Sequence, residues 1–167
     1  MRILVSDTSV LIDLERGGLL EAAFSLSWEF AVPDLLYERE LRNYGGERLV
    51  EFGLRVADLE PDEIGRALIY RQQQVALSLA DTFALSLAAS RGWNLLTGDG
   101  RLRDLARSER VTCHGVLWVL DQLHEEAATP IQSLHAGLTM IANHPRCRLP
   151  KRDIAVRLER FCADKES

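Results

Sequence analysis

The chain has 167 residues, which is enough for one sizeable core and short for two domains, and its 47% apolar and 27% charged residues are typical of globular proteins. Its net charge of -5 argues against a protein that binds nucleic acid over its whole surface, although local binding is still possible. No signal peptide or membrane-spanning stretch is present and the three cysteines form no motif, so we expect free thiols and a cytoplasmic protein.

Short apolar segments alternate with helical ones along the chain. Predicted strands cover residues 2–6, 29–32, 54–59, 94–97 and 111–113. Predicted helices cover residues 10–14, 19–25, a segment starting near 34, 47–52, 61–74, 79–89, 101–110, 116–124, 130–142 and 150–163. This alternation predicts an α/β fold of three layers, α/β/α, with a central, mostly parallel sheet.

The pattern changes near the C-terminus, where two amphipathic helices follow each other without a strand between them. We therefore expect residues 1–125 to form the main domain and residues 126–167 a C-terminal helical extension of it. Residues 164–167 are polar and are predicted to form a tail.

Four carboxylates stand next to apolar segments. Asp7 follows the first predicted strand, Glu40 lies among Leu and Tyr residues, Asp81 opens an apolar helix, and Asp99 follows the fourth strand. The carboxyl ends of parallel strands meet at one sheet edge, so Asp7 and Asp99 are expected there, and Asp81 could face it. Carboxylates that converge in this way repel one another unless a cation neutralises them, and Mg²⁺ is the natural candidate.

Each acid also has a purely structural interpretation. Asp7 and Asp99 could cap the helices that follow them, and Asp81 could be an ordinary acid at a helix start. Thr8 and Ser9 could contact a phosphate or a metal-bound water, or act as cap partners. Thr97 could orient Asp99, or simply be a β-branched strand residue.

Four segments together resemble the PIN-domain nucleases, which include the VapC-like toxins. They are LVSDTSVLIDL, VPDLLYEREL, SLADTFALSLA and NLLTGDGRL, and the acids follow the family's order of Asp, Glu, Asp, Asp. The resemblance covers about residues 1–125 and includes the segment VTCHGVLWVLDQL. It implies hydrolysis of RNA phosphodiester bonds that depends on Mg²⁺ or Mn²⁺, with Asp7, Glu40, Asp81 and Asp99 as metal ligands and catalytic residues.

The family's glutamate could fall on either of two positions. At 100° per residue Glu40 lies on the same helix face as Leu36, Tyr37, Leu41 and Tyr44, whereas Glu38 lies opposite. We therefore favour Glu40 and keep Glu38 as the alternative.

Downstream of Asp99 the chain departs from the family. Where an additional acid often follows, it has Gly-Arg-Leu-Arg, with Asp104 the nearest carboxylate, so a second metal is in doubt. Arg101 and Arg103 are the best candidates for contact with an RNA phosphate, and the later arginines are interpreted as solvated.

The resemblance further implies a cognate antitoxin protein and a homodimer, for which the apolar C-terminal helices could supply an interface. The competing hypothesis is a catalytically weak PIN-like domain that binds RNA or protein. Haloacid dehalogenase, receiver and Rossmann functions fit poorly, because the paired acids, the late lysine and the Gly-rich turn that they need are missing.

Overall fold

The computed structural model describes residues 2–163, and the predicted polar tail at 164–167 lies outside them. The described part contains a five-stranded sheet in the order β3-β2-β1-β4-β5, with every neighbouring pair parallel. Its strands are β1 (Ile3–Ser6), β2 (Glu29–Pro33), β3 (Arg55–Ala57), β4 (Asn94–Leu96) and β5 (Cys113–His114). The predicted three-layer α/β/α class with a parallel sheet is confirmed.

The helices follow the predicted segments closely. They are α1 (Thr8–Arg16), α2 (Leu20–Ala23), α3 (Asp34–Leu36), the π-helical η1 (Tyr37–Leu41), α4 (Gly46–Phe52), α5 (Pro61–Gln73), α6 (Leu79–Arg91), α7 (Gly100–Ser108), α8 (Val116–Glu125), α9 (Ile131–Asn143) and α10 (Lys151–Ala163). Within residues 2–163 no helix is both long and apolar enough to cross a membrane.

The chain packs as two units, which interleave along the sequence. Among the described residues, unit 1 contains residues 2–10 and 27–115, and unit 2 contains residues 11–26 and 116–163. Unit 1 holds the whole sheet together with α3 to α7, whereas α8 to α10 belong to unit 2.

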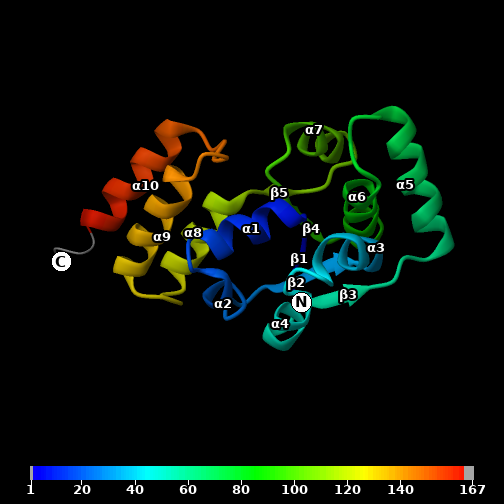
Figure 1. The fold of residues 1–167 in the computed structure, drawn as a ribbon. Helices are drawn as coiled ribbons and strands as arrows, with labels where there is room; N and C mark the ends of the chain where they lie inside the picture. Colours follow the sequence, from blue (N-terminus) through cyan, green and yellow to red (C-terminus); the bar gives the residue numbers. More distant parts are fainter. Residues whose placement is uncertain (1, 164–167) are drawn as a thin grey trace. The chain divides into compact units, whose positions relative to one another are not determined.

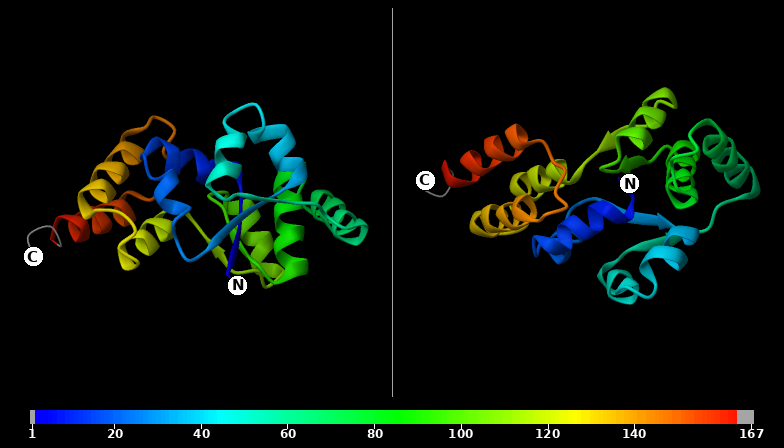
Figure 2. Two further views of the ribbon diagram at one scale, coloured as in Figure 1. Left: turned by 90° about the horizontal axis from the view of Figure 1, so that it is seen from below. Right: turned by 45° about the horizontal axis from the view of Figure 1, so that its top comes forward.

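Helix α6 is the central helix of unit 1. It packs against β1, β2 and β4, and α5 lies along it (Figure 1 and Figure 2). Eight residues of α6 are buried, namely Ala80 and all residues from Thr82 to Ala88. Asp81, between them, is half-exposed. A helix that is apolar on almost every side is stable only when neighbours cover it, so α6 forms the core of this unit together with residues such as Val5 and Leu95.

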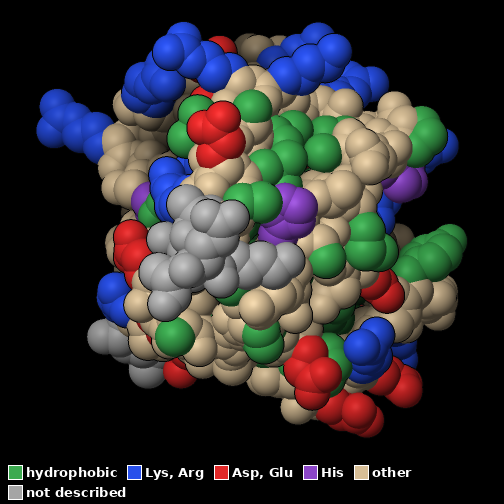
Figure 3. Space-filling view, turned by 90° about the vertical axis from the view of Figure 1, so that its left-hand side faces the viewer, with side chains coloured by type: hydrophobic (Ala, Val, Ile, Leu, Met, Phe, Trp, Pro, Cys, Tyr) green, Lys and Arg blue, Asp and Glu red, His purple; other side chains and the backbone are tan. Residues whose placement is uncertain are grey.

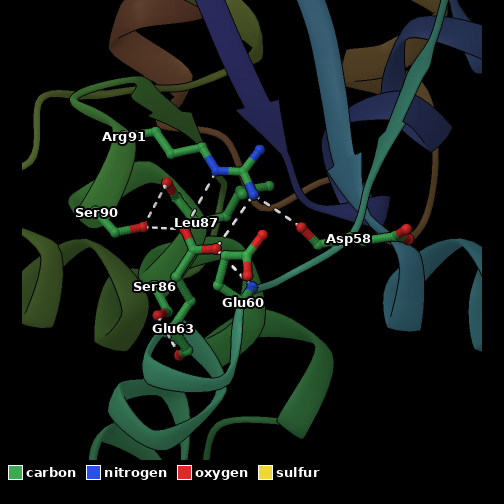
Figure 4. A network of polar contacts seen from close by, with 7 residues as sticks. All are labelled: Asp58, Glu60, Glu63, Ser86, Leu87, Ser90 and Arg91. Carbon is green, nitrogen blue, oxygen red and sulfur yellow. Dashed lines mark hydrogen bonds and ion pairs between the residues drawn. The ribbon is translucent and has the colours of Figure 1, made fainter.

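A polar network centred on the buried Glu63 joins α5 to α6 (Figure 4). The Arg91 guanidinium donates two hydrogen bonds to Glu63, from Nε to Oε2 at 3.2 Å and from Nη2 to Oε1 at 3.1 Å. Ser90 donates to the same carboxylate, and the Glu60 N–H donates to Oε1 at 2.7 Å. Burial raises the pKa of Glu63, but these donors outweigh burial and lower the pKa to about 2.

Unit 2 contains a close approach between two glycines. A Cβ atom at Gly137 in α9 would lie 2.7 Å from the Gly17 carbonyl oxygen and 2.7 Å from Leu19 Cδ1. In the same unit, Arg157 of α10 binds Asp121 of α8 through two hydrogen bonds of 2.9 and 2.8 Å. Unit 2 is therefore held by tight backbone packing as well as by its apolar helix faces.

Candidate active site

Two of the four predicted acids, Asp7 and Asp99, follow the carboxyl ends of the adjacent strands β1 and β4, at the same edge of the sheet. β1 pairs with β4 in the register Val5 to Leu95 and Ser6 to Leu96, and the Asp7 N–H extends this ladder to the Leu96 carbonyl at 2.9 Å. The strand order reverses direction between β1 and β4, which is where open α/β sheets bind ligands.

Asp7 is buried and surrounded by hydrogen-bond donors. Oδ1 accepts from the Ser9 hydroxyl at 2.9 Å and the Val10 N–H at 3.0 Å. Oδ2 accepts from the Thr97 hydroxyl at 2.5 Å and the Gly98 N–H at 3.3 Å. Burial raises the pKa of Asp7, and these four donors only partly offset that effect.

Thr97 connects the first acid to the last. Its hydroxyl donates to Asp7 and accepts from the Asp99 N–H at 3.0 Å, and the residue is fully buried. Asp99 is the N-cap of α7, because its Oδ1 accepts from the N–H groups of Arg101 and Leu102. The cap uses only Oδ1, so the Oδ2 atom of Asp99 is left for another role.

The structure places Glu40, and not Glu38, beside Asp7. Burial raises the pKa of Glu40, the Thr8 hydroxyl lowers it, and the negative charge of Asp7 raises it further. Glu38 instead forms an exposed ion pair with Arg42 at 2.7 Å. Glu40 lies in η1, where the Arg42 N–H reaches the Tyr37 carbonyl five residues earlier, and π-helical turns of this kind are frequent at functional sites.

Two buried polar atoms near this glutamate lack hydrogen bonds. Neither Oε2 of Glu40 nor the Thr8 hydroxyl has a partner of normal geometry among the described residues, although the hydroxyl is near enough to stabilise the charge on Glu40. Buried polar atoms are rarely left in this state, since each costs about 1–3 kcal/mol. A cation or an ordered water at this position would satisfy them.

Asp81 completes the group of four. Burial and the charge of Asp7 raise its pKa, the Ser78 hydroxyl lowers it, and the charges of Glu40 and Asp99 raise it again, to about 6. Ser78 also caps α6 by accepting from the Asp81 N–H at 3.1 Å. Asp81 is therefore close enough to the other three acids for each of their charges to raise its pKa, although the four come from separate segments.

The donor set fits a hard cation without forming a ready-made cage. Within residues 2–163, no three His, Cys, Asp or Glu side chains lie close enough together to hold a metal ion directly. Mg²⁺ commonly takes one or two carboxylates and keeps several waters, so acids that reach it through water are compatible with binding. The unpaired oxygen of Glu40 and the oxygen-only chemistry of the site agree with such an ion.

The two predicted arginines differ in position. Arg101 is exposed on the first turn of α7, whereas Nη2 of Arg103 lies 3.4 Å from the Thr97 carbonyl. The sequence interpretation passed over Arg107 and Arg110, which line a pocket together with Arg103. Their spacing of four and three residues, which repeats every helical turn, is the signal that would have revealed this shared face.

Comparison with known proteins agrees with this geometry. Among curated proteins none matches the chain. A family model described as a PIN domain matches residues 3–161, which is nearly the whole chain and includes all four acids and both units. The chain therefore belongs to the PIN-domain family, whose members are generally nucleases.

Proposed function

We propose that the protein is a divalent-metal-dependent endoribonuclease that hydrolyses RNA phosphodiester bonds at the four acids. The observation that carries this proposal is that the charges of Asp7, Glu40 and Asp99 all act on Asp81, together with the unpaired buried oxygen of Glu40. Placing four carboxylates together is unfavourable for folding, so it requires a functional reason.

The four acids would have different roles. Asp99 and Glu40 have oxygen atoms without a hydrogen bond in the site and would hold a Mg²⁺ or Mn²⁺ ion, with Asp7 contributing if the Ser9 hydroxyl turns away. When bound, such an ion supplies positive charge against the scissile phosphate and makes a nearby water more acidic. Asp81, with its pKa of about 6, is suited to accept a proton from the attacking water near neutral pH.

Neighbouring residues would position these acids. Thr97 fixes Asp7 and Asp99 relative to each other, and Ser9 and Gly98 hold the remaining contacts of Asp7. Thr8 lies near the unpaired oxygen of Glu40 and could donate to a water or to a phosphate oxygen. Arg101 and Arg103 follow Asp99 on α7 and would contact the RNA backbone.

The test is cleavage of a mixed set of single-stranded and structured RNAs with Mg²⁺, with Mn²⁺ and with EDTA. Asp99→Asn and Asp81→Asn should reduce cleavage at least a hundredfold, since Asn keeps the size of each side chain and still caps α7. Glu38→Gln and Asp104→Asn are matched controls, because both acids are exposed and should be dispensable. Equal cleavage by Asp99→Asn and the wild type would reject the proposal.

A binding module without strong catalysis is the second candidate. It is favoured by the absence of a ready-made metal cage within residues 2–163 and by the four donors that already occupy Asp7. This function would be established if the wild-type protein bound RNA but cleaved none of the set with either metal.

We further propose that the protein is a VapC-like toxin that forms a homodimer and is inhibited by a cognate antitoxin. The support is the family membership and the exposed apolar side chains of unit 2, among them Met140 and Val156. Figure 3 shows one face on which hydrophobic side chains are exposed among basic, acidic and histidine side chains. Growth arrest on expression, relieved by the product of the adjacent reading frame, tests the toxin role, and light scattering of wild type and Met140→Glu tests the dimer.

A further inference from the structure

A pocket lined by three arginines lies between α7 and the start of β5, in unit 1. Its volume is about 360 Å³, at the lower end of the range for small-ligand sites. The lining residues are Arg103, Arg107, Arg110, Val111, Thr112 and Cys113. We call it the arginine pocket.

The charges of the arginine pocket are scarcely neutralised. Arg107 lies 3.9 Å from Asp104 in a fully solvated pair, and Arg103 reaches only the Thr97 carbonyl. No ion pair joins Arg110 to any residue between 2 and 163. Arg103 and Arg107 lie one turn apart on α7, Arg110 follows just beyond the end of the helix, and all three line the pocket.

Arg110 also occupies a backbone position that normally requires glycine. Its φ angle is +59°, and the Val111 N–H reaches back to the Ala106 carbonyl at 2.9 Å. α6 ends in the same way, with the Trp93 N–H bound to the Ala88 carbonyl, but there the left-handed residue is Gly92. The backbone of an arginine is strained in this conformation, whereas that of a glycine would not be. An arginine at this position therefore indicates a functional role for its side chain.

The arginine pocket is linked to two of the four acids through α7 and Thr97. Asp99 caps the helix that carries Arg103, and Arg103 contacts the carbonyl of Thr97, whose hydroxyl binds Asp7. Along α7, Arg103 lies about 6 Å beyond Asp99 and Arg107 about 6 Å further, at 1.5 Å per residue. A single strand with one phosphate at the acids would therefore carry its next phosphates along this arginine face.

We propose that the arginine pocket binds a backbone phosphate of the RNA strand, beyond the phosphate that is cleaved. This inference rests on the proposed function for the identity of the strand. Arginine suits the role because its planar fork contacts two phosphate oxygens at once.

The first test measures binding of a short fluorescein-labelled single-stranded RNA in EDTA, so that cleavage cannot deplete the probe. Arg110→Gly should weaken binding about fivefold and reduce the slope of log Kd against log salt by about 0.7, the value for one single-strand contact. The triple variant Arg103→Gln, Arg107→Gln, Arg110→Gly should reduce the slope by about 2. Thermal unfolding of Arg110→Gly should stay unchanged or rise, because glycine relieves the strain.

Two matched controls separate the charge from the backbone effect. Ala127→Gly relieves the same kind of strain in the turn after α8, since Ala127 has φ +50°, without removing a charge. Arg152→Gln removes an exposed arginine of α10. Both should leave RNA affinity and salt slope unchanged. A triple variant that binds with the wild-type slope, or a wild type that shows no binding, overturns the proposal.

The second test locates the RNA through Cys113. In a Cys147→Ser, Cys162→Ser background Cys113 is the single remaining thiol, half-buried in the pocket lining. RNA in EDTA should slow its alkylation by iodoacetamide several-fold, and the triple arginine variant should lose this protection. If RNA leaves alkylation unchanged, the pocket serves another occupant, such as an acidic protein segment, and the proposal is wrong. Cleavage by the wild type and by Asp99→Asn is measured in a separate experiment. The nuclease proposal can therefore fail while the phosphate-binding proposal holds, and the phosphate-binding proposal can fail while the nuclease proposal holds.

Discussion

Thr97 is the residue on which the geometry of the acid group depends most directly. Its hydroxyl is the closest donor to Asp7 and the acceptor for the Asp99 N–H. Thr97→Val keeps the shape but removes both hydrogen bonds, so we expect cleavage to fall about 10- to 100-fold and stability to fall by about 1–3 kcal/mol. RNA cleavage rates and urea unfolding measure the two effects.

Thr97→Ser is the matched control, because it restores the hydroxyl while removing the methyl group. It should recover most of the cleavage rate even though the lost methyl group leaves a small cavity. If Ser and Val were equally impaired, the methyl group and not the hydroxyl would be what the site requires.

Asp81 carries a charge that destabilises the folded protein, and we expect the same charge to be required for cleavage. Its raised pKa of about 6 means that the charged form is disfavoured in the folded state at neutral pH. Without a divalent ion, Asp81→Asn should therefore stabilise the protein by about 1–3 kcal/mol at pH 8, while abolishing cleavage. Added Mg²⁺ should raise the melting temperature of the wild type more than that of the variant. A variant less stable than the wild type in EDTA would contradict this account.

For single residues, the sequence predicted where a side chain lies better than it predicted which groups surround that side chain. Glu40 lies beside Asp7, as helical phase indicated, but the segment is a π-helical turn and Tyr44, expected on the same buried face, is 79% exposed. Leu36 and Leu41, which define the apolar face, are buried on either side of Glu40, and the role of Glu40 in the site stays a prediction. Neither the π turn nor the four donors around Asp7 follow from local pattern, because both depend on contacts between distant segments.

The pair of helices α5 and α6 owes part of its stability to one partly buried ion pair, between Arg91 and Glu63. Glu63 has a pKa lowered from 4.5 to about 2, so its charged form stabilises the folded state. This contribution is complete above pH 4.5 and is lost as the pH falls from 4.5 toward 2, for a total of up to about 3 kcal/mol. Glu63→Gln should lower stability by a similar amount at pH 7, and the two proteins should converge near pH 2.

Urea unfolding between pH 7 and pH 2.5 measures this difference. Asp62→Asn is the matched control, because Asp62 lies in the same first turn of α5 but is exposed, and it should shift stability by only a few tenths of a kcal/mol. A constant difference between Glu63→Gln and the wild type across the whole pH range would mean that packing, and not charge, accounts for the loss.

Elements were the most predictable level of this protein. Strands such as β1 and β4 are short apolar runs ended by polar residues, and helices begin at visible caps such as Ser78. Helix ends were harder to predict. Glycine favours the left-handed conformation that ends α6 at Gly92, whereas Arg110 adopts the same conformation although its side chain disfavours it. The left-handed turn at Arg110 could not be predicted from the sequence, since backbone strain is visible only in the folded structure.

At the scale of the whole molecule, the order of the chain conceals the division into units. Residues 11–26 belong with residues 116–167, so α1 begins in unit 1 and ends in unit 2. Apolar patterning shows that a helix buries one face but not which distant helix covers it. The sequence therefore predicted a C-terminal extension made of one uninterrupted segment, residues 126–167. That this segment extends the nuclease domain stays a prediction.

The glycine contact within unit 2 tests whether the two units unfold independently. Gly137→Ala should destabilise unit 2 by about 1–3 kcal/mol, because the new Cβ would lie 2.7 Å from the Gly17 carbonyl oxygen, although alanine favours helix. Gly65→Ala is the matched control, since its Cβ would meet nothing within 4 Å in α5 and should stabilise the protein by about 1 kcal/mol. Hydrogen exchange by mass spectrometry should show faster exchange in α9 and α10 of Gly137→Ala with β1 and β4 unchanged, because a unit that opens alone leaves the other protected. Equal acceleration in both sets would mean that the two units form one cooperative structure, so that mutations in unit 2 would also disturb the acids of unit 1.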